Sequence, residues 1–217
     1  MNLKRVVITG LGTINPLGHN VPEFWGNLIK GVSGAGPITR FDASKFRTQF
    51  ACEVKDYDPI SYFDKKEVRK MDLYTQFGLI AAREALQDSG LDKEQENVKR
   101  IGVIWGAGIG GLQTFFEECR DFATGDGTPR FNPFFIPKMI ANMAGGMIAI
   151  EHGFKGPNYT TVSACASSAH ALVDALDLIR LGKADVIVAG GSEAAITVPG
   201  VGGFSACLLY TSPSPRD

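Results

Sequence analysis

The stretch from residue 159 to residue 189 constrains the fold more than any other part of the chain, because it reads as strand, helix, strand. Short apolar strands are expected at Tyr159–Ala164 and Asp185–Ala189, with a helix at Ala166–Leu181 between them. A unit of this size is a crossover that connects two parallel strands. Strands and helices alternate along the rest of the chain as well, which indicates an α/β fold whose ligands gather beyond the carboxyl ends of the strands.

The remaining elements follow from hydrophobic spacing and from turn residues. The clearest is an amphipathic helix at Asp72–Ser89, where apolar residues recur at helical spacing and Gly90 ends the pattern. Residues 35–70 are predicted to form an excursion with turn signals, and residues 125–137 an ordered apolar loop. We also expect strands at Arg5–Thr9 and Ile101–Trp105 and helices at Glu23–Lys30, Leu112–Phe122 and Ile140–His152.

Cys165 lies at the junction between the strand Tyr159–Ala164 and the helix that follows it. A helix start presents free N–H groups and the positive end of its dipole, which favour the thiolate, the nucleophilic form of cysteine. A lone cysteine can equally be a small buried core residue. The helix after Cys165 is apolar nearly all round, so we expect it to be buried between layers and the thiol to be reached through a tunnel.

Composition argues against several classes of function. The 217 residues carry a formal net charge of -1 and show no basic stripe with interleaved aromatics, which argues against nucleic-acid recognition. The cysteines lack CxxC spacing, so we expect reduced thiols rather than a disulfide framework or a metal site. The start does not read as a signal peptide, and no run of about 18 apolar residues suggests a membrane span. The expected location is the cytoplasm.

Two further patterns resemble functional motifs. Gly106, Gly108 and Gly111 have the spacing of a dinucleotide-binding loop, but no second strand with an acidic end follows. We therefore favour close backbone packing or a bend over a substrate. His170 follows Cys165 on the same helix by five residues, or about 140° round the axis, so its ring is not expected to face the thiol.

A basic cluster precedes the amphipathic helix. Its members are Lys65, Lys66, Arg69 and Lys70. Such a run is usually a solvated face, and it can also steer and dock an acidic partner. The residues alone leave both interpretations open.

The stretch Thr161-Val-Ser-Ala-Cys-Ala-Ser-Ser-Ala-His-Ala171 resembles the β-ketoacyl-acyl-carrier-protein synthases, in particular the type II enzymes of fatty acid elongation. Further matches follow in the same order along residues 3 to about 206, which makes the resemblance specific. They are Arg5-Val-Val-Ile-Thr-Gly-Leu-Gly12, Arg69-Lys-Met-Asp72, Gly106-Ala-Gly-Ile-Gly-Gly111, Pro133-Phe-Phe-Ile-Pro137, Asp185-Val-Ile-Val-Ala-Gly-Gly-Ser-Glu193 and Gly200-Val-Gly-Gly-Phe204.

The resemblance implies a thiolase-like α/β fold, of which this chain would hold one αβαβα half of a duplicated, five-layered structure. It also implies an acyltransferase of fatty acid biosynthesis that works by decarboxylative Claisen condensation. Cys165 would accept an acyl group as a thioester, and its N–H would help form an oxyanion hole. Malonyl-carrier protein would lose carbon dioxide, and its carbanion would attack that thioester. No cofactor is implied, because acyl groups arrive on the phosphopantetheine of acyl carrier protein.

The same matching assigns roles to further residues. Ile109 would gate the acyl pocket, and Phe204 would lie near the pocket or its gating region. Phe134 or Phe135 would reach across a homodimer interface into the partner's pocket. The residues implied to dock acyl carrier protein are Lys66, Arg69, Lys70 and Arg130.

The resemblance also implies that two catalytic histidines, an active-site lysine and a second oxyanion donor belong to a second half beyond these 217 residues. Residues 1–206 are expected to be the N-terminal half, inactive alone in condensation. Residues 207–217 do not match the family and are interpreted as a non-native tail. The alternative is a non-catalytic fragment or scaffold that keeps only carrier-protein and acyl-pocket surfaces. The presence of Cys165 favours descent from a catalyst.

Overall fold

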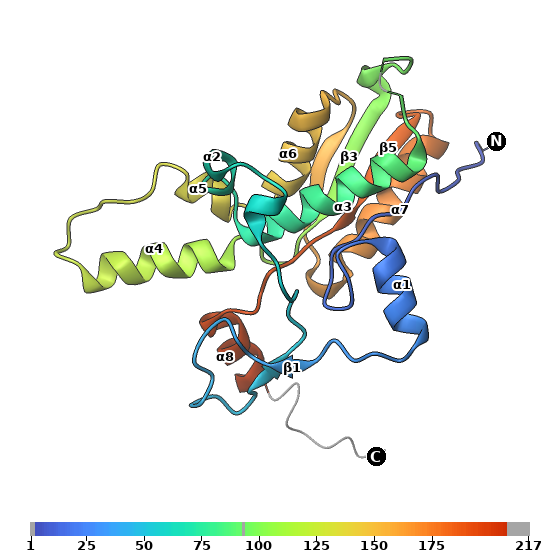
Figure 1. The fold of residues 1–217 in the computed structure, drawn as a ribbon. Coiled ribbons are helices and arrows are strands. Elements are labelled where there is room, and N and C mark those ends of the chain that lie inside the picture. Colours follow the sequence, from blue (N-terminus) through green and yellow to red (C-terminus); the bar gives the residue numbers. More distant parts are fainter. Residues whose placement is uncertain (1–2, 93, 208–217) are drawn as a thin grey trace.

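The computed structural model describes residues 3–92 and 94–207, so residues 208–217 of the predicted tail lie outside the described residues. At its centre is a parallel three-stranded sheet in the order β4–β3–β5 (Figure 1). The strands are β3 (Ile101–Gly106), β4 (Asn158–Thr161) and β5 (Val186–Gly191). The chain passes from β4 to β5 through α7 (Ser167–Arg180), which confirms the predicted parallel crossover.

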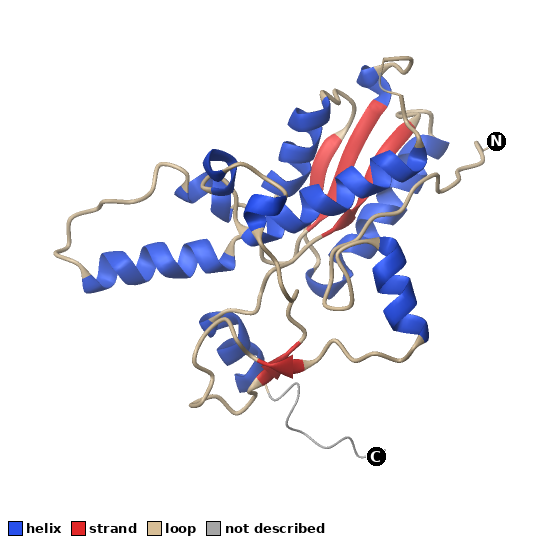
Figure 2. Ribbon diagram, in the orientation of Figure 1, coloured by secondary structure: helices blue, strands red, loops and turns tan. Residues whose placement is uncertain are grey.

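Helices cover both faces of this sheet. α3 (Leu73–Ser89) and α6 (Met143–His152) lie against one face, and α7 lies against the other (Figure 2). Every residue of β3 is buried, and its side chains alternate between the two layers. Trp105 belongs to the cluster that includes α3 and α6, whereas Ile104 packs against Ala171 and Ala175 of α7. Burial on both faces explains why β3 reads as an unbroken apolar run.

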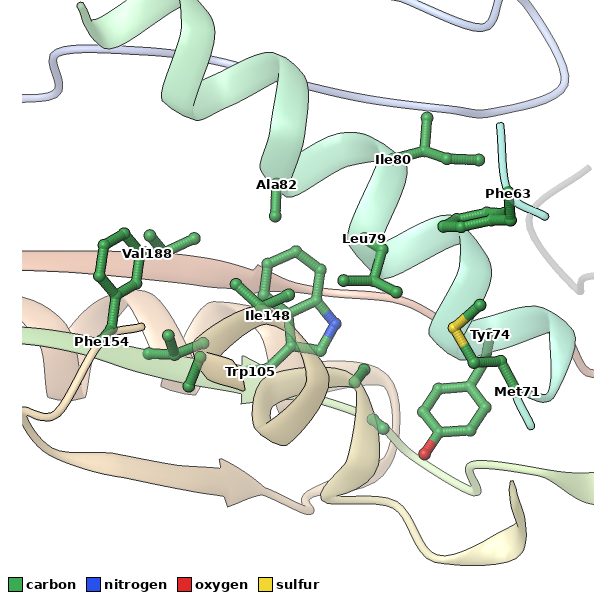
Figure 3. Close-up of a cluster of buried hydrophobic side chains, with 14 of the residues drawn as sticks. Phe63, Met71, Tyr74, Leu79, Ile80, Ala82, Trp105, Ile148, Phe154 and Val188 are labelled. Carbon is green, nitrogen blue, oxygen red and sulfur yellow. The ribbon is translucent and has the colours of Figure 1, made fainter. Parts of the chain in front are cut away.

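The larger cluster of buried side chains joins the sheet to α3 and α6 (Figure 3). Trp105 lies among them, and its indole N–H donates to the Ser192 Oγ at 2.9 Å, so the ring is buried without an unpaired donor. α3 begins at the predicted place because the Asp72 side chain accepts from the Tyr74 N–H. It ends at Gly90, whose φ of 64° suits glycine.

The other elements surround this core, and α4 and the loop that follows it form an arm that projects from it, with α5 at the base of the arm (Figure 1). Within residues 3–92 and 94–207, no helix has the length and hydropathy needed to cross a membrane. The remaining helices are α1 (Val21–Ile29), α2 (Lys65–Val68), α4 (Leu112–Thr124), α5 (Phe135–Met139) and α8 (Val198–Ala206). The short elements are strands β1 (Gly36–Pro37) and β2 (Phe50–Ala51) and 3-10 turns η1 (Pro59–Ser61), η2 (Val98–Arg100) and η3 (Ala164–Ala166).

The prediction of a strand at Arg5–Thr9 is wrong for the described residues, where this segment pairs with no strand. Ile8 is 81% exposed. The backbone that follows lies along α3 instead, because the Asp88 and Glu84 carboxylates accept N–H bonds from it at 2.9 and 2.8 Å. An apolar run becomes a strand only where the edge of another strand is available to pair with it. Here carboxylates of α3 accept the N–H bonds of the nearby backbone instead.

The expectation that the helix after Cys165 is buried all round is also wrong for the described chain. α7 packs on the sheet through Ala171 and Ala175, while Leu172 and Val173 on its other side are 55% and 53% exposed. Cys165 is itself exposed, so no tunnel encloses it here. The apolar residues are present as predicted, but no other part of the described chain covers this face.

We predict that Ile148→Ala will lower the free energy of unfolding by about 2–5 kcal/mol, because it leaves a cavity between α6 and the sheet. Ile148 is 0% exposed, whereas Ile150 on the same helix is 73% exposed. The matched control Ile150→Ala should therefore change stability by no more than about 0.5 kcal/mol. Urea denaturation followed by circular dichroism measures both. Equal losses would contradict the packing of α6 described above.

A second prediction concerns Arg100 and Asp185, which join the amino ends of β3 and β5. The Arg100 guanidinium donates to both Asp185 oxygens and holds the pKa of that carboxyl at about 2, below its ordinary 3.8. Because the pKa of Asp185 is lower in the folded chain than in the unfolded chain, its ionised carboxylate stabilises the fold at pH values above 3.8. This contribution is lost as the pH falls through about 2. In Arg100→Gln the pKa of Asp185 should rise toward 3.8, as measured by an NMR titration. An unchanged titration would show that the ion pair does not form in solution.

Candidate active site

Cys165 lies in η3, the 3-10 turn between β4 and the first turn of α7. This is the strand–helix junction that the sequence predicted, at the carboxyl end of the sheet. Cys165 is exposed and is therefore not a buried core residue. The preceding Ala164 has a φ of 51°, a left-handed conformation that costs a residue with a side chain about 1–3 kcal/mol. The surroundings must hold such a turn in place.

Ser167 supplies much of that support. Its side chain is buried, and its Oγ accepts from the Ser163 N–H at 2.9 Å and donates to the Ala164 carbonyl at 2.7 Å. The Thr161 hydroxyl at the end of β4 donates to the Ser167 carbonyl at 2.7 Å. These bonds join the end of the strand, the turn that carries Cys165 and the start of α7 into one network. The network holds the turn that carries Cys165 in place.

Cys165 lines a cavity of about 330 Å³ together with Ile109 and Phe204. Ile109 comes from the loop after β3, and Phe204 comes from α8. The structure thus brings together the predicted nucleophile and two of the residues predicted to line or gate an acyl pocket. Ile109 is 44% exposed and Phe204 is 48% exposed, so the cavity is open to solvent in the described chain.

The loop Gly106–Gly111 brings Ile109 to this cavity, and its glycines permit two close approaches. A Cβ on Gly106 would lie 2.4 Å from the carbonyl carbon of Ser167, so the end of β3 can touch α7 only without a side chain. Gly110 has a φ of 85°, which a residue with a side chain rarely adopts. The interpretation of this motif as close backbone packing is confirmed.

Glu193 ends one of the stretches that carry the family resemblance, but the sequence assigned it no role. It follows β5, and its carboxylate accepts N–H bonds from Gly108, Ile109 and Gly110 at 2.8, 2.8 and 3.1 Å. The signal available in the sequence was an acidic residue just beyond an apolar strand that ends in Gly190-Gly191. The glycine loop follows the neighbouring strand, and the carboxyl ends of parallel strands meet at one edge of the sheet.

Histidine does not supply a base to Cys165 in the described residues. The His170 Nδ1 lies 2.6 Å from the Ser163 Oγ, in agreement with the prediction that its ring does not face the thiol. His19 contacts the Tyr62 hydroxyl and the Lys55 carbonyl, on the excursion of residues 35–70. Among the described residues, no group of three or more His, Cys, Asp or Glu side chains could hold a metal ion.

Three of the four residues predicted to dock a carrier protein lie together. Lys66, Arg69 and Lys70 are exposed on α2 and on the turn that follows it. Arg130 lies on the loop between α4 and α5, and it pairs with Asp126 at 3.4 Å. The first three residues lie on or next to one helix, whereas Arg130 belongs to another segment of the chain.

The cavity lined by Cys165 does not include Phe134 or Phe135 of the same chain. Phe134 precedes α5 and is 38% exposed. Phe135 stacks on Phe115 and Phe131, with ring centroids 6.4 and 5.5 Å apart. Both residues belong to the projecting arm, and their proposed reach across a homodimer interface stays a prediction.

We predict that Ser167→Ala will loosen the turn that carries Cys165. The loss of two hydrogen bonds at a buried site should lower the free energy of unfolding by about 1–3 kcal/mol. The exposed neighbour Ser168 provides the control Ser168→Ala, which removes a hydroxyl without a described hydrogen bond and should change stability by less than about 0.5 kcal/mol. Thermal denaturation measures both changes. If the two variants are equally stable, Ser167 does not support the turn.

Comparison with known proteins places these features in a family. A family model described as the beta-ketoacyl synthase N-terminal domain matches residues 3–216. The 3-oxoacyl-[acyl-carrier-protein] synthases 2 of Coxiella burnetii and Synechocystis sp. are 47% and 45% identical to the chain and cover 95% and 98% of it. The matches cover 50% and 51% of those proteins, so the chain spans about half the length of the curated relatives it matches.

Solved structures with the same fold are also ketosynthases. The ishigamide ketosynthase/chain length factor has a TM-score of 0.86 at 29% identity, and a beta-ketoacyl synthase from Burkholderia phymatum has 0.80 at 25%; each match covers 99% of this chain and 52% of the other. A ketosynthase in complex with its type II PKS acyl-carrier protein has a TM-score of 0.77 at 23% identity, covering 91% of this chain and 52% of that one. These structures confirm the predicted thiolase-like α/β half. The chain belongs to the β-ketoacyl synthase family and corresponds to its N-terminal domain.

Proposed function

We propose that the chain is the N-terminal half of an elongating β-ketoacyl-acyl-carrier-protein synthase, and that Cys165 is its acyl acceptor. The observation that carries this proposal is the placement of Cys165, on a strained turn at a cavity shared with Ile109 and Phe204. Relatives named 3-oxoacyl-[acyl-carrier-protein] synthase 2 support the class of reaction. The activity belongs to the whole enzyme, of which this chain spans about half.

In the first step, the Cys165 thiolate would attack the carbonyl carbon of an acyl group carried on the phosphopantetheine of acyl carrier protein. A new S–C bond forms, the old thioester bond breaks, and the phosphopantetheine sulfur leaves as a thiolate that takes up a proton from water. The carbonyl oxygen becomes negative in between, and the Cys165 N–H would stabilise it as part of an oxyanion hole. The start of α7 places free N–H groups and the positive end of the helix dipole next to this turn.

The second step would join two carbon chains. Malonyl-carrier protein would lose carbon dioxide, its carbanion would attack the acyl-Cys165 thioester, and the Cys165 thiolate would leave as the carbon–carbon bond forms. The histidines and the lysine that the family resemblance implies for this step are not among the 217 residues. His170, the histidine that follows Cys165 on α7, is hydrogen-bonded to Ser163 instead. We therefore expect this chain to accept an acyl group and not to condense it.

Acyl carrier protein is the proposed partner, and α2 is its proposed dock. Lys66, Arg69 and Lys70 are exposed there, and such a cluster would steer an acidic protein toward the site. A ketosynthase of the same fold has been solved with its acyl-carrier protein. A homodimer formed through the arm of α4 and α5, and a cytoplasmic location, complete the proposal. The exposed apolar side chains on that arm, such as Phe115 at 46%, support the homodimer.

The proposal predicts that dodecanoyl-CoA acylates Cys165 of the purified chain and that Cys165→Ala abolishes this labelling. Cys119 is also free and exposed, so Cys119→Ala is the matched control and should keep the parent rate. Mass spectrometry of the peptides identifies the acylated residue. If Cys165→Ala were labelled as fast as the parent, Cys165 would not be the acceptor.

The same protein should form no 3-oxoacyl product when malonyl-carrier protein is added. The expected reason is that the groups that assist decarboxylation are absent from these residues, whereas acylation depends on the turn at Cys165. Product formation is measured by mass spectrometry of the carrier protein. A measurable condensation rate would show that this chain supplies those groups itself.

A third prediction addresses docking. The double variant Lys66→Glu/Lys70→Glu should weaken binding of acyl carrier protein by about 5- to 30-fold, because each change replaces attraction by repulsion. Lys99 is an exposed lysine in η2, at the opposite end of β3, and Lys99→Glu is the control. Fluorescence anisotropy at two salt concentrations measures the affinity. Binding that is insensitive both to the double variant and to salt would place the dock elsewhere.

A further inference from the structure

Glu193 binds the backbone of the glycine loop at three consecutive residues. Its Oε2 accepts from the Gly108 and Ile109 N–H groups, and its Oε1 accepts from Gly110. These bonds have a charged acceptor and are therefore stronger than bonds between neutral groups. Because all three donors are main-chain groups, the carboxylate fixes the path of the loop whatever its side chains are.

The residue before Glu193 is held in place by hydrogen bonds. This residue is Ser192, whose N–H donates to the Gly106 carbonyl at 3.1 Å and whose Oγ accepts from the buried Trp105 indole at 2.9 Å. Ser192 thus anchors the chain directly before Glu193 to the end of β3. The Glu193 carboxylate is held at a set place beyond the carboxyl ends of β3 and β5.

The far end of the loop is fixed separately. The Gly111 N–H donates to the Met139 carbonyl at 3.0 Å, and Thr114 in the first turn of α4 donates its N–H and hydroxyl to the buried Asp72 carboxylate at 3.1 and 2.5 Å. Between these two ends lie Gly108, Ile109 and Gly110. Glycine has the most conformational freedom of any residue, so this middle part depends on Glu193 for its shape.

The position of the loop decides the space beside the thiol. A Cβ on Gly108 would lie 3.0 Å from the Glu193 Oε2 and 3.4 Å from the Ala164 carbonyl oxygen, so the loop packs directly on the turn that carries Cys165. Ile109 lines the same cavity as Cys165. With its backbone held on both sides, Ile109 can change the cavity only by rotating its side chain.

We propose that Glu193 is a positioning residue that fixes Ile109 beside Cys165 and thereby sets the length of acyl chain that the cavity accepts. Glu193 also lines this cavity, and its proposed effect is on the loop backbone rather than on a reacting atom. The inference rests on the proposed function in one respect, namely that the ligand of Cys165 is an acyl group.

The test uses the full 217-residue chain and the variants Glu193→Gln, Glu193→Asp and Glu96→Gln. Glutamine keeps the size of the side chain but replaces one acceptor oxygen with an NH₂ group, which cannot accept an N–H bond. Aspartate keeps the charge. Glu96 is an exposed glutamate in the loop before η2, at the other end of β3, and serves as the control.

Two readouts separate positioning from stability. The first is hydrogen exchange of the amides in residues 106–111, which should become about tenfold faster in Glu193→Gln, partly recover in Glu193→Asp and stay at the parent rate in Glu96→Gln. The second is the ratio of Cys165 acylation rates with dodecanoyl-CoA and hexanoyl-CoA. This ratio should change by about fivefold or more in Glu193→Gln, whereas a general loss of stability would lower both rates together.

Parent-like exchange in Glu193→Gln overturns the proposal, because the loop would then keep its shape without the carboxylate. Faster exchange with an unchanged ratio also overturns it, since Glu193 would hold the loop without setting chain length. If neither thioester acylates the parent chain, the proposed function fails and the chain-length role fails with it. The exchange rates then still decide whether Glu193 positions the loop.

Discussion

The carboxyl end of β3 meets the first turn of α7 at Gly106, where a Cβ would lie 2.4 Å from the Ser167 carbonyl carbon. This contact determines how the rest of the site is arranged. It brings the end of β3 against the turn that carries Cys165, so the glycine loop passes directly beside the thiol. It also lets the Ser167 side chain reach back to Ser163 and Ala164. The sheet and the site are therefore joined through main-chain contact, which a side chain at position 106 would prevent.

The parts of the fold that were predictable have local causes. α3 carries its own signals, a capping Asp72 and a terminal Gly90, and β3 is buried on both faces and reads as apolar throughout. The run Arg5–Thr9 has the same apolar signal, yet it forms no strand in the described residues, since pairing depends on a distant edge. The same limit applies to the site. The place of Cys165 could be predicted from the strand–helix junction in the sequence. Glu193 reaches the glycine loop only because β3 and β5 are paired, in a register that sets Gly106 opposite Gly191.

The described chain holds the thiol proposed to accept an acyl group and the proposed acyl cavity on one framework. The two proposed steps need different groups. Accepting an acyl group needs an activated thiol, whereas condensation also needs groups that assist decarboxylation. The exposed residues of α7, such as Leu172 and Val173, lie on the side of that helix away from the sheet. An apolar face that the described chain leaves uncovered is expected where another structural layer packs on it.

Ala164 shows how stability and the proposed reactivity of Cys165 would oppose each other in this turn. Its φ of 51° is unfavourable for alanine and free of strain for glycine, so Ala164→Gly would relieve the native turn. The same change would also allow backbone conformations that the methyl group of alanine excludes. Cys165 would then spend less time in the position proposed for its reaction. Evolution toward a more stable chain would therefore be expected to alter the helices around the core and to leave this strained alanine unchanged.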